Sequence, residues 1–574
     1  MIRHLTGYTL QQLRTVDGLP VRYDGGLVLI GPSPGGVCVS CAEQARLAAL
    51  GSAVPRQNPR MSFGGLVVPA MQPLVDKLIA SVQADPLAHK NIVIAVRADL
   101  GTVDRHIVRP RSGGCPDCGP LPDDFAEDAP AAPVSPGSLR GANPKADNLR
   151  EKLLDLRHGP VTGIFKTGYL PLAVMSAELT GDHKEYGFGR TVDFASAERV
   201  ALYEAVERHN GMRPRRTRSV IEASFTQLGP ERAVDPSRVG RYDPEHVDHP
   251  SFPLTPYRPH VKTQWVQGWS YTQQKPLAVP EHLAYWAASS HNQFVSETSN
   301  GCGLGNSLAE AVLHGLFEVA ERDAFLMAWY ARTPLHRIRI PDDDVLPHLA
   351  DRLESLGYEL TFFNATNDLG IPAVISTARY QGSNADTPRI FYAAGAHPDP
   401  HKAMVSAAVE LAVDVEATVD KVVTEPRLYN RERLVRLLEN PQWIRTMTEH
   451  VLVNALPEAA ERHDFLLGTK EIDVPGATAP EFDDLRAMLD HYVYQLRKLK
   501  LEIIAVDQTD PVLAEQLGLH SAKVIVPGTL PMTFGQLLRR TRGLPRLLEV
   551  PQQIGRLPAQ LTYESLALQP HPFP

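Results

Sequence analysis

Two stretches of this sequence carry pairs of glutamates at a spacing that gathers them on one side of a helix. The pattern Glu-x-x-Glu-Arg occurs at 204–208 and again at 318–322, and residues three apart are neighbours on a helical face. A helical wheel places Glu310 on the same side as the second pair, opposite an apolar arc that includes Leu313 and Leu316. Carboxylates gathered without lysine partners favour a hard cation such as Mg²⁺, which commonly bridges to nucleotide phosphates. An acidic helix face that is simply solvated is the alternative.

The sequence lacks the usual phosphate-binding loop. No G-x-x-x-x-G-K-[ST] motif occurs, and the chain contains no Gly-Lys dipeptide, so a nucleotide would have to bind without a P-loop. Glycines alternate at 301–305, but no strand-like run leads into them, as a dinucleotide-binding turn requires. If phosphates are bound, the acidic segments are therefore the place where we expect them.

Four of the five cysteines form two C-x2-C pairs, Cys38 with Cys41 and Cys115 with Cys118. Two such pairs complete a four-sulfur zinc site without an open position, so the metal would hold structure rather than react. A redox pair and unrelated buried thiols are the alternatives. Cys302 stands apart in a glycine-rich stretch, and we expect it to be a small buried residue.

Composition divides the chain into three parts. Residues 121–146 are rich in Pro and Ala, lack apolar periodicity and are expected to form a linker. Residues 1–120 precede it, and 147–574 follow as one long region. The alternation of helical and strand-like runs predicts a mixed α/β (α+β) fold, with a large domain preceded by a small zinc-tetrathiolate α/β domain. We expect helices at 71–82, 195–210, 307–330, 404–419 and 483–500, and strands at 26–30, 91–96, 359–363, 371–378, 501–506 and 523–526.

Charge and hydropathy exclude several classes of protein. The 574 residues carry a formal net charge of −8, so general nucleic-acid binding through a basic surface is not expected. No apolar run approaches the roughly 18 residues of a membrane span, and the first residues lack the apolar core of a secretory signal. These features predict a cytoplasmic protein without membrane association.

The chain ends in alternating prolines, at Pro570, Pro572 and Pro574. This spacing favours an extended polyproline conformation without internal hydrogen bonds. Tails of this composition are commonly disordered, which is the alternative.

Taken together, these residues resemble a known family, the YcaO family of ATP-dependent amide-activating enzymes. The resemblance covers residues 147–574 and is strongest at 189–211, 299–324, 393–412 and 507–528. It implies ATP bound through acidic helices and Mg²⁺ rather than through a P-loop. It also implies Mg²⁺–phosphate ligands at Glu204, Glu207, Glu310, Glu318 and Glu321, nucleotide or phosphate contacts at Asn306 and Arg322, and a late Arg/Glu pair at Arg546 and Glu549. Val200, Gly303 and Val413 depart from the residues common in the family.

The proline tail resembles that of the azoline-forming branch, which makes thiazole- and oxazole-modified peptides such as thiopeptides. In that branch the tail enters the active site, and the resemblance makes the terminal carboxylate of Pro574 a candidate general base, with Arg322 beside the transferred phosphoryl group. Residues 1–120 resemble the zinc-bearing part of a ThiF-like module. Because fewer than 40 residues precede Cys38, we expect leader-peptide recognition on a separate ThiF-like F protein. A reduced recognition element within residues 1–120 is the alternative.

The activity implied is ATP-dependent cyclodehydration of Cys, Ser or Thr in a ribosomal precursor peptide. Further implied partners are a downstream flavin dehydrogenase and a second copy of the chain in a homodimer. Thioamide or amidine formation by the same ATP site is the first alternative, and it would use no proline tail. A catalytically inactive peptide-binding scaffold is the second, although unpaired carboxylates are not expected in a pure binding module.

Overall fold

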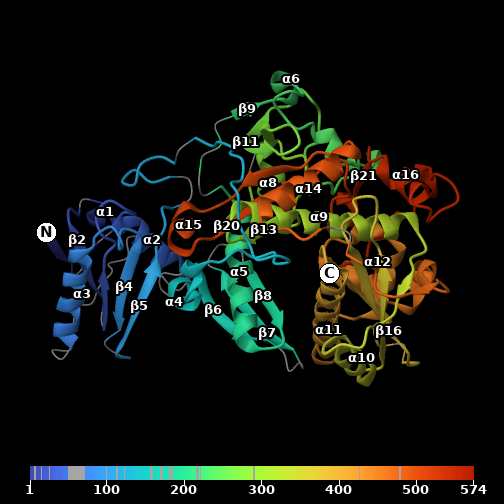
Figure 1. Cartoon of the computed structure of the whole chain (residues 1–574), viewed down its shortest axis with the longest axis horizontal. Helices are drawn as coiled ribbons and strands as arrows, with labels where there is room; N and C mark the ends of the chain where they lie inside the picture. The colour runs from blue at the N-terminus through green and yellow to red at the C-terminus, as the bar shows by residue number, and fades with distance from the viewer. Residues whose placement is uncertain are drawn as a thin grey trace.

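The computed structural model describes residues 1–574 with the exception of 6–7, 9, 15, 25, 50–70, 98–99, 112–113, 122, 155–159, 168–171, 180–184, 215–216, 218, 220, 289–290, 385, 426 and 478–479. The molecule is elongated (Figure 1). The N-terminal sheet lies at one end, the unit around α5 lies in the middle, and the unit around α11 and β16 lies at the other end.

The N-terminal part is a five-stranded sheet in the order β1-β2-β3-β4-β5, in which β1 and β2 are parallel. Its core strands alternate between two apolar faces: Leu27 and Leu29 face the cysteine-bearing side, whereas Val28 and Ile30 pack with Val75 and other residues of α3. The elements are β1 (Ile2–Leu5), α1 (Leu10–Leu13), β2 (Leu19–Asp24), β3 (Leu27–Ile30), α2 (Val39–Ala49), α3 (Gln72–Ala84), β4 (Ile92–Arg97) and β5 (Thr102–Ile107).

Within the described residues, the rest of the chain forms three further sheets of three or more strands and a two-stranded pair. The six-stranded sheet has the order β12-β11-β19-β20-β13 with β9 paired to β11, and the others are β17-β16-β15-β14-β18, β6-β7-β8 and β10-β21. The strands are β6 (Val161–Lys166), β7 (Ala173–Leu179), β8 (Tyr186–Thr191), β9 (Ile221–Ala223), β10 (Arg241–Tyr242), β11 (Thr263–Ser270), β12 (Lys275–Pro280), β13 (Cys302–Gly305), β14 (Arg337–Ile338), β15 (Tyr358–Asn364), β16 (Ala373–Tyr380), β17 (Ile390–Ala396), β18 (Glu471–Ile472), β19 (Ile504–Asp507), β20 (His520–Ile525) and β21 (Arg540–Arg542).

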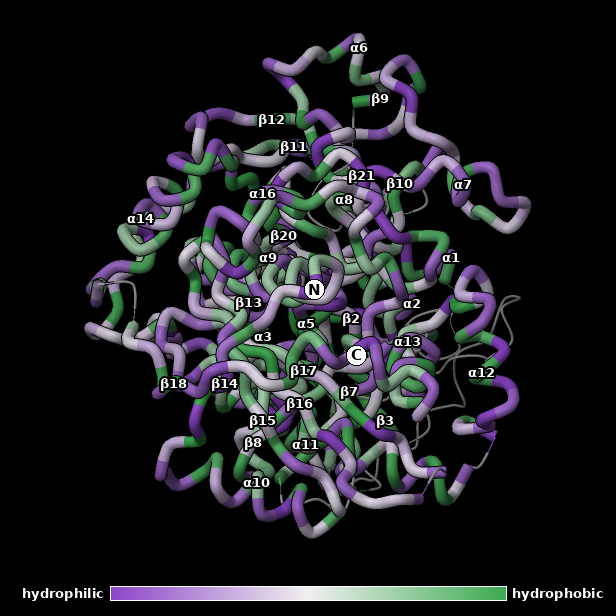
Figure 2. Tube along the Cα trace, turned by 90° about the vertical axis from the view of Figure 1, so that its right-hand side faces the viewer, coloured by the Kyte–Doolittle hydropathy of each residue, from purple (hydrophilic) through white to green (hydrophobic). Residues whose placement is uncertain are grey.

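Helices cover these sheets and confirm the predicted mixed α/β class. In Figure 2 the strands lie mainly inside, whereas α7, α10 and α12 lie at the outer edge. The helices are α4 (Leu149–Leu153), α5 (Phe194–Met212), α6 (Phe225–Leu228), α7 (Pro244–Val247), α8 (Glu281–Ala284), α9 (Leu308–Ala331), α10 (Leu346–Ser355), α11 (Pro400–Thr424), α12 (Arg431–Glu439), α13 (Met447–Asn454), α14 (Leu485–Lys498), α15 (Pro511–Leu517) and α16 (Arg546–Gln553).

Three long helices each lie close against a strand because that strand carries a glycine. A Cβ atom on Gly189 of β8 would lie 1.8 Å from the Ala197 carbonyl of α5, and one on Gly303 of β13 would lie 2.1 Å from the Ala311 carbonyl of α9. Helix α11 approaches β17 in the same way. Since no side chain fits at these points, the glycines bring the helix backbones close to their sheets.

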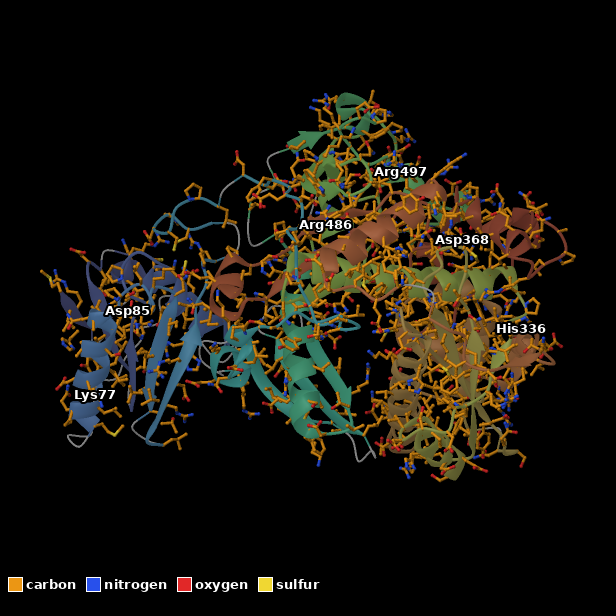
Figure 3. The ribbon with its side chains drawn as sticks, in the orientation of Figure 1. Lys77, Asp85, His336, Asp368, Arg486 and Arg497 are labelled. Atoms are coloured by element: carbon orange, nitrogen blue, oxygen red, sulfur yellow. The ribbon has the colours of Figure 1, made fainter. Side chains whose placement is uncertain are left out.

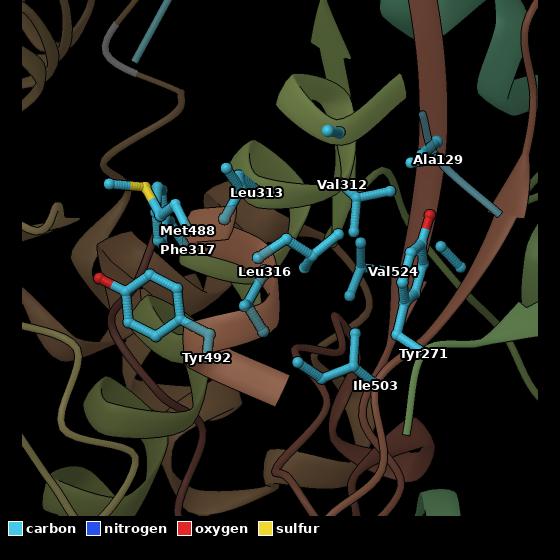
Figure 4. Packing of buried hydrophobic residues seen from close by; sticks show 14 of the residues in the cluster. Ala129, Tyr271, Val312, Leu313, Leu316, Phe317, Met488, Tyr492, Ile503 and Val524 are labelled. Carbon is cyan, nitrogen blue, oxygen red and sulfur yellow. The ribbon is translucent and has the colours of Figure 1, made fainter. Parts of the chain in front are cut away.

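The apolar arc predicted for the second acidic segment is buried as expected. Leu313, Leu316 and Phe317 of α9 pack against Tyr492 of α14 and Val524 of β20 (Figure 4). Because the apolar face of α9 packs against α14 and β20, the acidic face on the opposite side of α9 points toward α5 and α11.

The segment expected to be a linker, 121–146, runs along the large unit formed by residues 147–574. Ala129 and Ala132 are buried in its core, and Arg486 of α14 (labelled in Figure 3) donates to the Ala129 carbonyl at 2.7 Å. The Val134 amide donates to the Asp483 carbonyl at 2.9 Å. The chain is therefore packed here rather than free, and the division at 121–146 into separate domains stays a prediction.

Candidate active site

A cavity of about 540 Å³ lies where α5, α9 and α11 face one another, and the end of the chain reaches it. Carboxylates and arginines from all three helices and from β8 line it, together with a loop at 298–300. The lining residues are Arg140, Phe188, Arg190, Val200, Tyr203, Glu204, Glu207, Arg208, Thr298, Ser299, Asn300, Cys302, Leu304, His314, Glu318, Arg322, Glu410, Asp414, Met447, Met532, Phe534 and Pro574.

Helix α5 contributes two of the predicted glutamates. Glu204 accepts hydrogen bonds from the Phe188 amide at 2.7 Å and from Arg208 Nε at 3.0 Å. Glu207 has no ion-pair partner within the described part of the chain. Burial raises the pKa of Glu207 to about 8, and the negative charges of Glu318 and Glu204 add to this shift.

Helix α9 contributes the matching pair. Glu318 accepts from the Gly301 amide at 2.9 Å and pairs with Arg322 at 3.3 Å. Glu321 also pairs with Arg322 and lies at the edge of the cavity rather than in its lining. Burial raises the pKa of Glu321 to about 7 although Arg322 opposes the shift, and burial raises the pKa of Glu318 in the same direction.

Helix α11 contributes two acids that sequence reasoning missed. Glu410 and Asp414 lie 3.4 Å and 3.8 Å from the guanidinium of Arg190 on β8. Burial raises the pKa of Asp414 to about 7 despite this arginine, and Glu410 adds to the shift. The available signal was their i,i+4 spacing within the mostly apolar stretch 403–415 of this helix.

The donor set fits Mg²⁺ bound with phosphate groups. Arg190, Arg208 and Arg322 are each already shared between two of the acids around them. Five of the carboxylates described here line the cavity, namely Glu204, Glu207, Glu318, Glu410 and Asp414, and Glu321 lies at its edge. Burial is the main cause of the raised pKa values of Glu207, Glu321 and Asp414, and the neighbouring carboxylates add to it. Hard oxygen ligands of this kind suit Mg²⁺, and the remaining faces of the arginines suit phosphate oxygens.

Two predicted ligands hold the chain beside the cavity instead of lining it. Glu310 is buried and accepts from the Gly141 amide at 2.9 Å and from Arg140 at 3.2 Å. Asn306 donates to the Gly141 carbonyl at 2.8 Å and accepts from Asn143 at 2.9 Å. Their contacts position residues 140–143, and Arg140 from that segment reaches the cavity.

The late Arg/Glu pair is not brought to the cavity. Arg546 binds buried Asp323 through both terminal nitrogens, at 3.0 Å and 2.9 Å, and also binds Asp368 (labelled in Figure 3). Glu549 lies one turn along α16 from Arg546 and does not line the cavity either. Two aspartates already neutralise the charge of Arg546 in this arrangement, and a nucleotide contact by Arg546 and Glu549 stays a prediction.

The C-terminal tail is ordered and its last residue lines the cavity. Asn454 donates to the Pro570 carbonyl at 2.9 Å, and His450 Nδ1 donates to the His571 carbonyl at 3.0 Å. Phe573 is buried edge-on against Phe325, with ring centroids 4.8 Å apart, and the guanidinium of Arg322 lies 4.1 Å from its centroid. The disordered alternative is wrong, because these contacts place Pro574 among the acids.

A buried lysine that sequence reasoning missed supports the loop at 298–300. Lys523 on β20 donates to the carbonyls of Thr298 and Asn300, at 3.2 Å and 2.5 Å, and pairs with Glu297 at 3.3 Å. Asn300 in turn accepts from Arg322 Nε at 3.2 Å. A lysine inside an apolar strand was the available signal, because such a residue is rarely buried without a partner.

The fifth cysteine behaves as expected. Cys302 is buried, lies 3.6 Å from the side-chain oxygen of Gln508, and touches the cavity from β13. Burial raises the pKa of its thiol to about 12, which keeps it protonated and unsuited to nucleophilic attack.

The four remaining cysteines come together in the N-terminal part. Their sulfur atoms all lie within 4.8 Å of one another, with Cys38 3.6 Å from Cys115 and Cys41 3.8 Å from Cys118. Four sulfurs held about 2.3 Å from a tetrahedral centre would be separated by about 3.8 Å. The geometry therefore fits a metal ion bound by four thiolates.

Comparison with known proteins adds an independent finding. The family model described as "YcaO cyclodehydratase, ATP-ad Mg2+-binding" matches residues 188–530, more than half of the chain. An uncharacterized protein of Methanothermobacter thermautotrophicus is 23% identical over 354 residues, which are 59% of this chain and 80% of that protein. A protein from the tfuA 3' region of Rhizobium leguminosarum bv. trifolii is 27% identical over 268 residues, 42% of this chain and 58% of that protein.

Two solved structures share the fold over almost the whole chain. A heterocyclase in complex with substrate and cofactor has a TM-score of 0.72 at 22% identity and covers 98% of this chain and 79% of its own. The heterocyclase TruD has a TM-score of 0.65 at 19% identity and covers 98% and 76%. None of the helices in the described residues has the length and apolar character of a membrane span.

Proposed function

The chain belongs to the YcaO family and is an ATP-dependent cyclodehydratase. From this premise we propose that it converts Cys, Ser or Thr residues of a ribosomally made precursor peptide into thiazolines or oxazolines. The observation that carries the proposal is that Pro574, the last residue, lines the same cavity as Glu207, Glu318 and Arg322. This arrangement places a candidate general base beside an acid-rich site that suits Mg²⁺ and nucleotide phosphates.

We propose that Glu204, Glu207, Glu318 and Glu321 hold Mg²⁺ with the nucleotide phosphates, and that Glu410 and Asp414 extend this set from α11. Glu310 and Asn306 position residues 140–143 at the wall of the cavity. Arg322, held by Glu318 and Asn300, stabilises negative charge on the transferred phosphoryl group.

The proposed reaction begins when the side-chain thiol or hydroxyl of the peptide attacks the preceding carbonyl carbon. The Pro574 carboxylate takes the proton of the attacking group, and a five-membered ring forms. MgATP, when bound, supplies the phosphoryl group that turns the former amide oxygen into a leaving group. That oxygen departs as phosphate, the ring nitrogen loses its proton, and a carbon–nitrogen double bond remains. The peptide loses one water for each ring.

The ordered tail supports this activity over thioamide or amidine formation, which would need no terminal carboxylate. The uncompensated carboxylates argue against an inactive scaffold, because a binding surface gains nothing from mutual repulsion. We further propose that leader-peptide recognition lies on a separate ThiF-like F protein, that a flavin dehydrogenase acts afterwards, and that the enzyme works as a homodimer.

Mass spectrometry of the precursor peptide tests the proposal. Incubation with ATP, Mg²⁺ and the partner protein should lower the peptide mass by one water per ring and release one phosphate for each. Replacement of an oxygen by sulfur would instead identify thioamide formation. Phosphate release without any change of peptide mass would contradict both activities.

We propose that the four-cysteine cluster holds a structural zinc ion. Elemental analysis should find one zinc per chain, and Cys115→Ser should lose it, because the site then offers three thiolates instead of four. The variant should lower the unfolding temperature of the N-terminal part while leaving nucleotide binding to the large unit unchanged. Cys302→Ser is the matched control and should keep its zinc. A zinc-free unmodified protein would contradict the proposal.

A further inference from the structure

A second pocket adjoins the active-site cavity at the end of the tail. It has a volume of about 180 Å³, and Asp414, Met447 and Pro574 line both spaces. Its other walls come from β17, α11 and the segment that carries α13. The last residue of the chain therefore stands between the nucleotide cavity and this pocket.

The pocket has an apolar floor and a polar rim. Phe391, Tyr392 and Leu452 at its base are buried. Around the opening lie two charged groups of opposite sign, two hydroxyl groups and a thioether that is 47% exposed. The residues of the rim are Asp414, Thr418, Lys421, Met447 and Thr448.

We propose that this pocket binds the side chain of the residue next to the ring-forming residue of the peptide, and that it selects an uncharged aliphatic or aromatic side chain. The proposal rests on the proposed function and adds a specificity-determining site to it. Its chemical class follows from the floor: burying a charge against Phe391 and Leu452 without a partner is unfavourable, whereas an apolar side chain gains from leaving water.

The size and position of the pocket fit this occupant. A protein cavity of about 150 Å³ can hold benzene, so a pocket of about 180 Å³ accommodates side chains up to those of leucine or phenylalanine. Successive side chains of an extended peptide point to opposite sides, and their Cα atoms lie about 3.8 Å apart. With the reacting side chain on one side of the Pro574 carboxylate, a neighbouring side chain falls on the other. The hydroxyls of Thr418 and Thr448 can then bond to the peptide backbone.

Ala417 of α11 lines the pocket. Ala417→Phe tests the proposal because the larger side chain fills the pocket without altering a carboxylate. The probe is the precursor peptide on which the unmodified enzyme forms rings, made with Gly, Leu or Lys on each side of one ring-forming residue. We expect the unmodified enzyme to process the Leu peptide at least tenfold faster than the Lys peptide at one of the two positions. Ala417→Phe should remove this preference by slowing the Leu peptide at least tenfold, while the Gly peptide and the affinity for a non-hydrolysable ATP analogue stay within twofold.

Val423→Phe is the matched control, since residue 423 is on the same helix, is 75% exposed and does not line the pocket. Equal slowing of all peptides by Ala417→Phe, or no slowing, would overturn the proposal. A loss of ATP-analogue affinity would overturn it too, because the pocket would then serve the nucleotide. Absence of rings with the unmodified enzyme is a separate result that removes the proposed function, and this subsite with it.

Discussion

Replacing Glu207 by glutamine should make the ligand-free protein more stable and at the same time nearly abolish ATP-dependent ring formation. The side chain is partly buried, has no ion-pair partner in the described part of the chain, and lies one helical turn from Glu204 and across the cavity from Glu318. Glutamine keeps the shape and cannot ionise, so it avoids the cost of burying a carboxylate beside two others. The same change removes a proposed Mg²⁺ ligand, so we expect a loss of roughly 10²–10³-fold in turnover, the range for one lost electrostatic contact to a transition state.

The gain in stability should depend on pH in a defined direction. Burial and the neighbouring glutamates raise the pKa of Glu207 from 4.5 to about 8, so in the folded protein this carboxyl binds a proton that the unfolded chain has already lost. Its favourable contribution is therefore complete below about pH 4.5 and disappears as the pH rises through 8. Glu207→Gln should thus differ little from the unmodified protein at pH 5 and exceed it by on the order of 1–3 kcal/mol at pH 8.

Urea unfolding at pH 5 and pH 8, with and without Mg²⁺ and an ATP analogue, measures this effect. Added Mg²⁺ and analogue should stabilise the unmodified protein at pH 8 and should leave Glu207→Gln almost unchanged. Glu198→Gln is the control, because this residue lies on the same helix and pairs with Arg150 outside the cavity. Turnover by Glu207→Gln within tenfold of the unmodified rate would contradict the metal-ligand role.

The acidic faces of α5 and α9 could be predicted from sequence because helical periodicity is local. What the helical wheel cannot give is position along the axis. Glu310 and Glu321 project in similar directions, but eleven residues at 1.5 Å each separate them by about 16 Å. Glu321 therefore lies beside the cavity edge with Arg322, whereas Glu310 lies a full three turns away and binds Gly141.

The acids of α11 could not be found in the same way because their role depends on a strand far away in sequence. Glu410 and Asp414 face the cavity only because β8 brings Arg190 and α5 to the other side.

The linker prediction had a related limit. Composition identified a segment without helical or strand periodicity, but small residues such as Ala129 and Ala132 can also pack into a core, so composition alone does not distinguish a free chain from a docked one.

Adding a single alanine after Pro574 should slow ring formation by roughly 10²–10⁴-fold, the usual contribution of a positioned general base. The addition displaces the terminal carboxylate by about 3.8 Å and leaves every residue of the tail in place. Deleting Phe573 and Pro574 is a less specific test, because Phe573 is 1% exposed and packs on Phe325 and Arg322. Loss of a buried phenylalanine costs about 3–5 kcal/mol and would also release Arg322.

Pro574→Ala keeps the terminal carboxylate and removes the pyrrolidine ring of the proline, so it tests the two groups separately. The hydrogen bonds from Asn454 to the Pro570 carbonyl and from His450 to the His571 carbonyl, together with buried Phe573, still place the end of the chain. This variant should therefore keep ring formation within tenfold of the unmodified rate. The unmodified protein, the protein extended by alanine and Pro574→Ala should all bind the ATP analogue equally. If the extended enzyme forms rings at the unmodified rate, the carboxylate is not the base, and the proton of the attacking thiol must go to a side chain of the cavity instead.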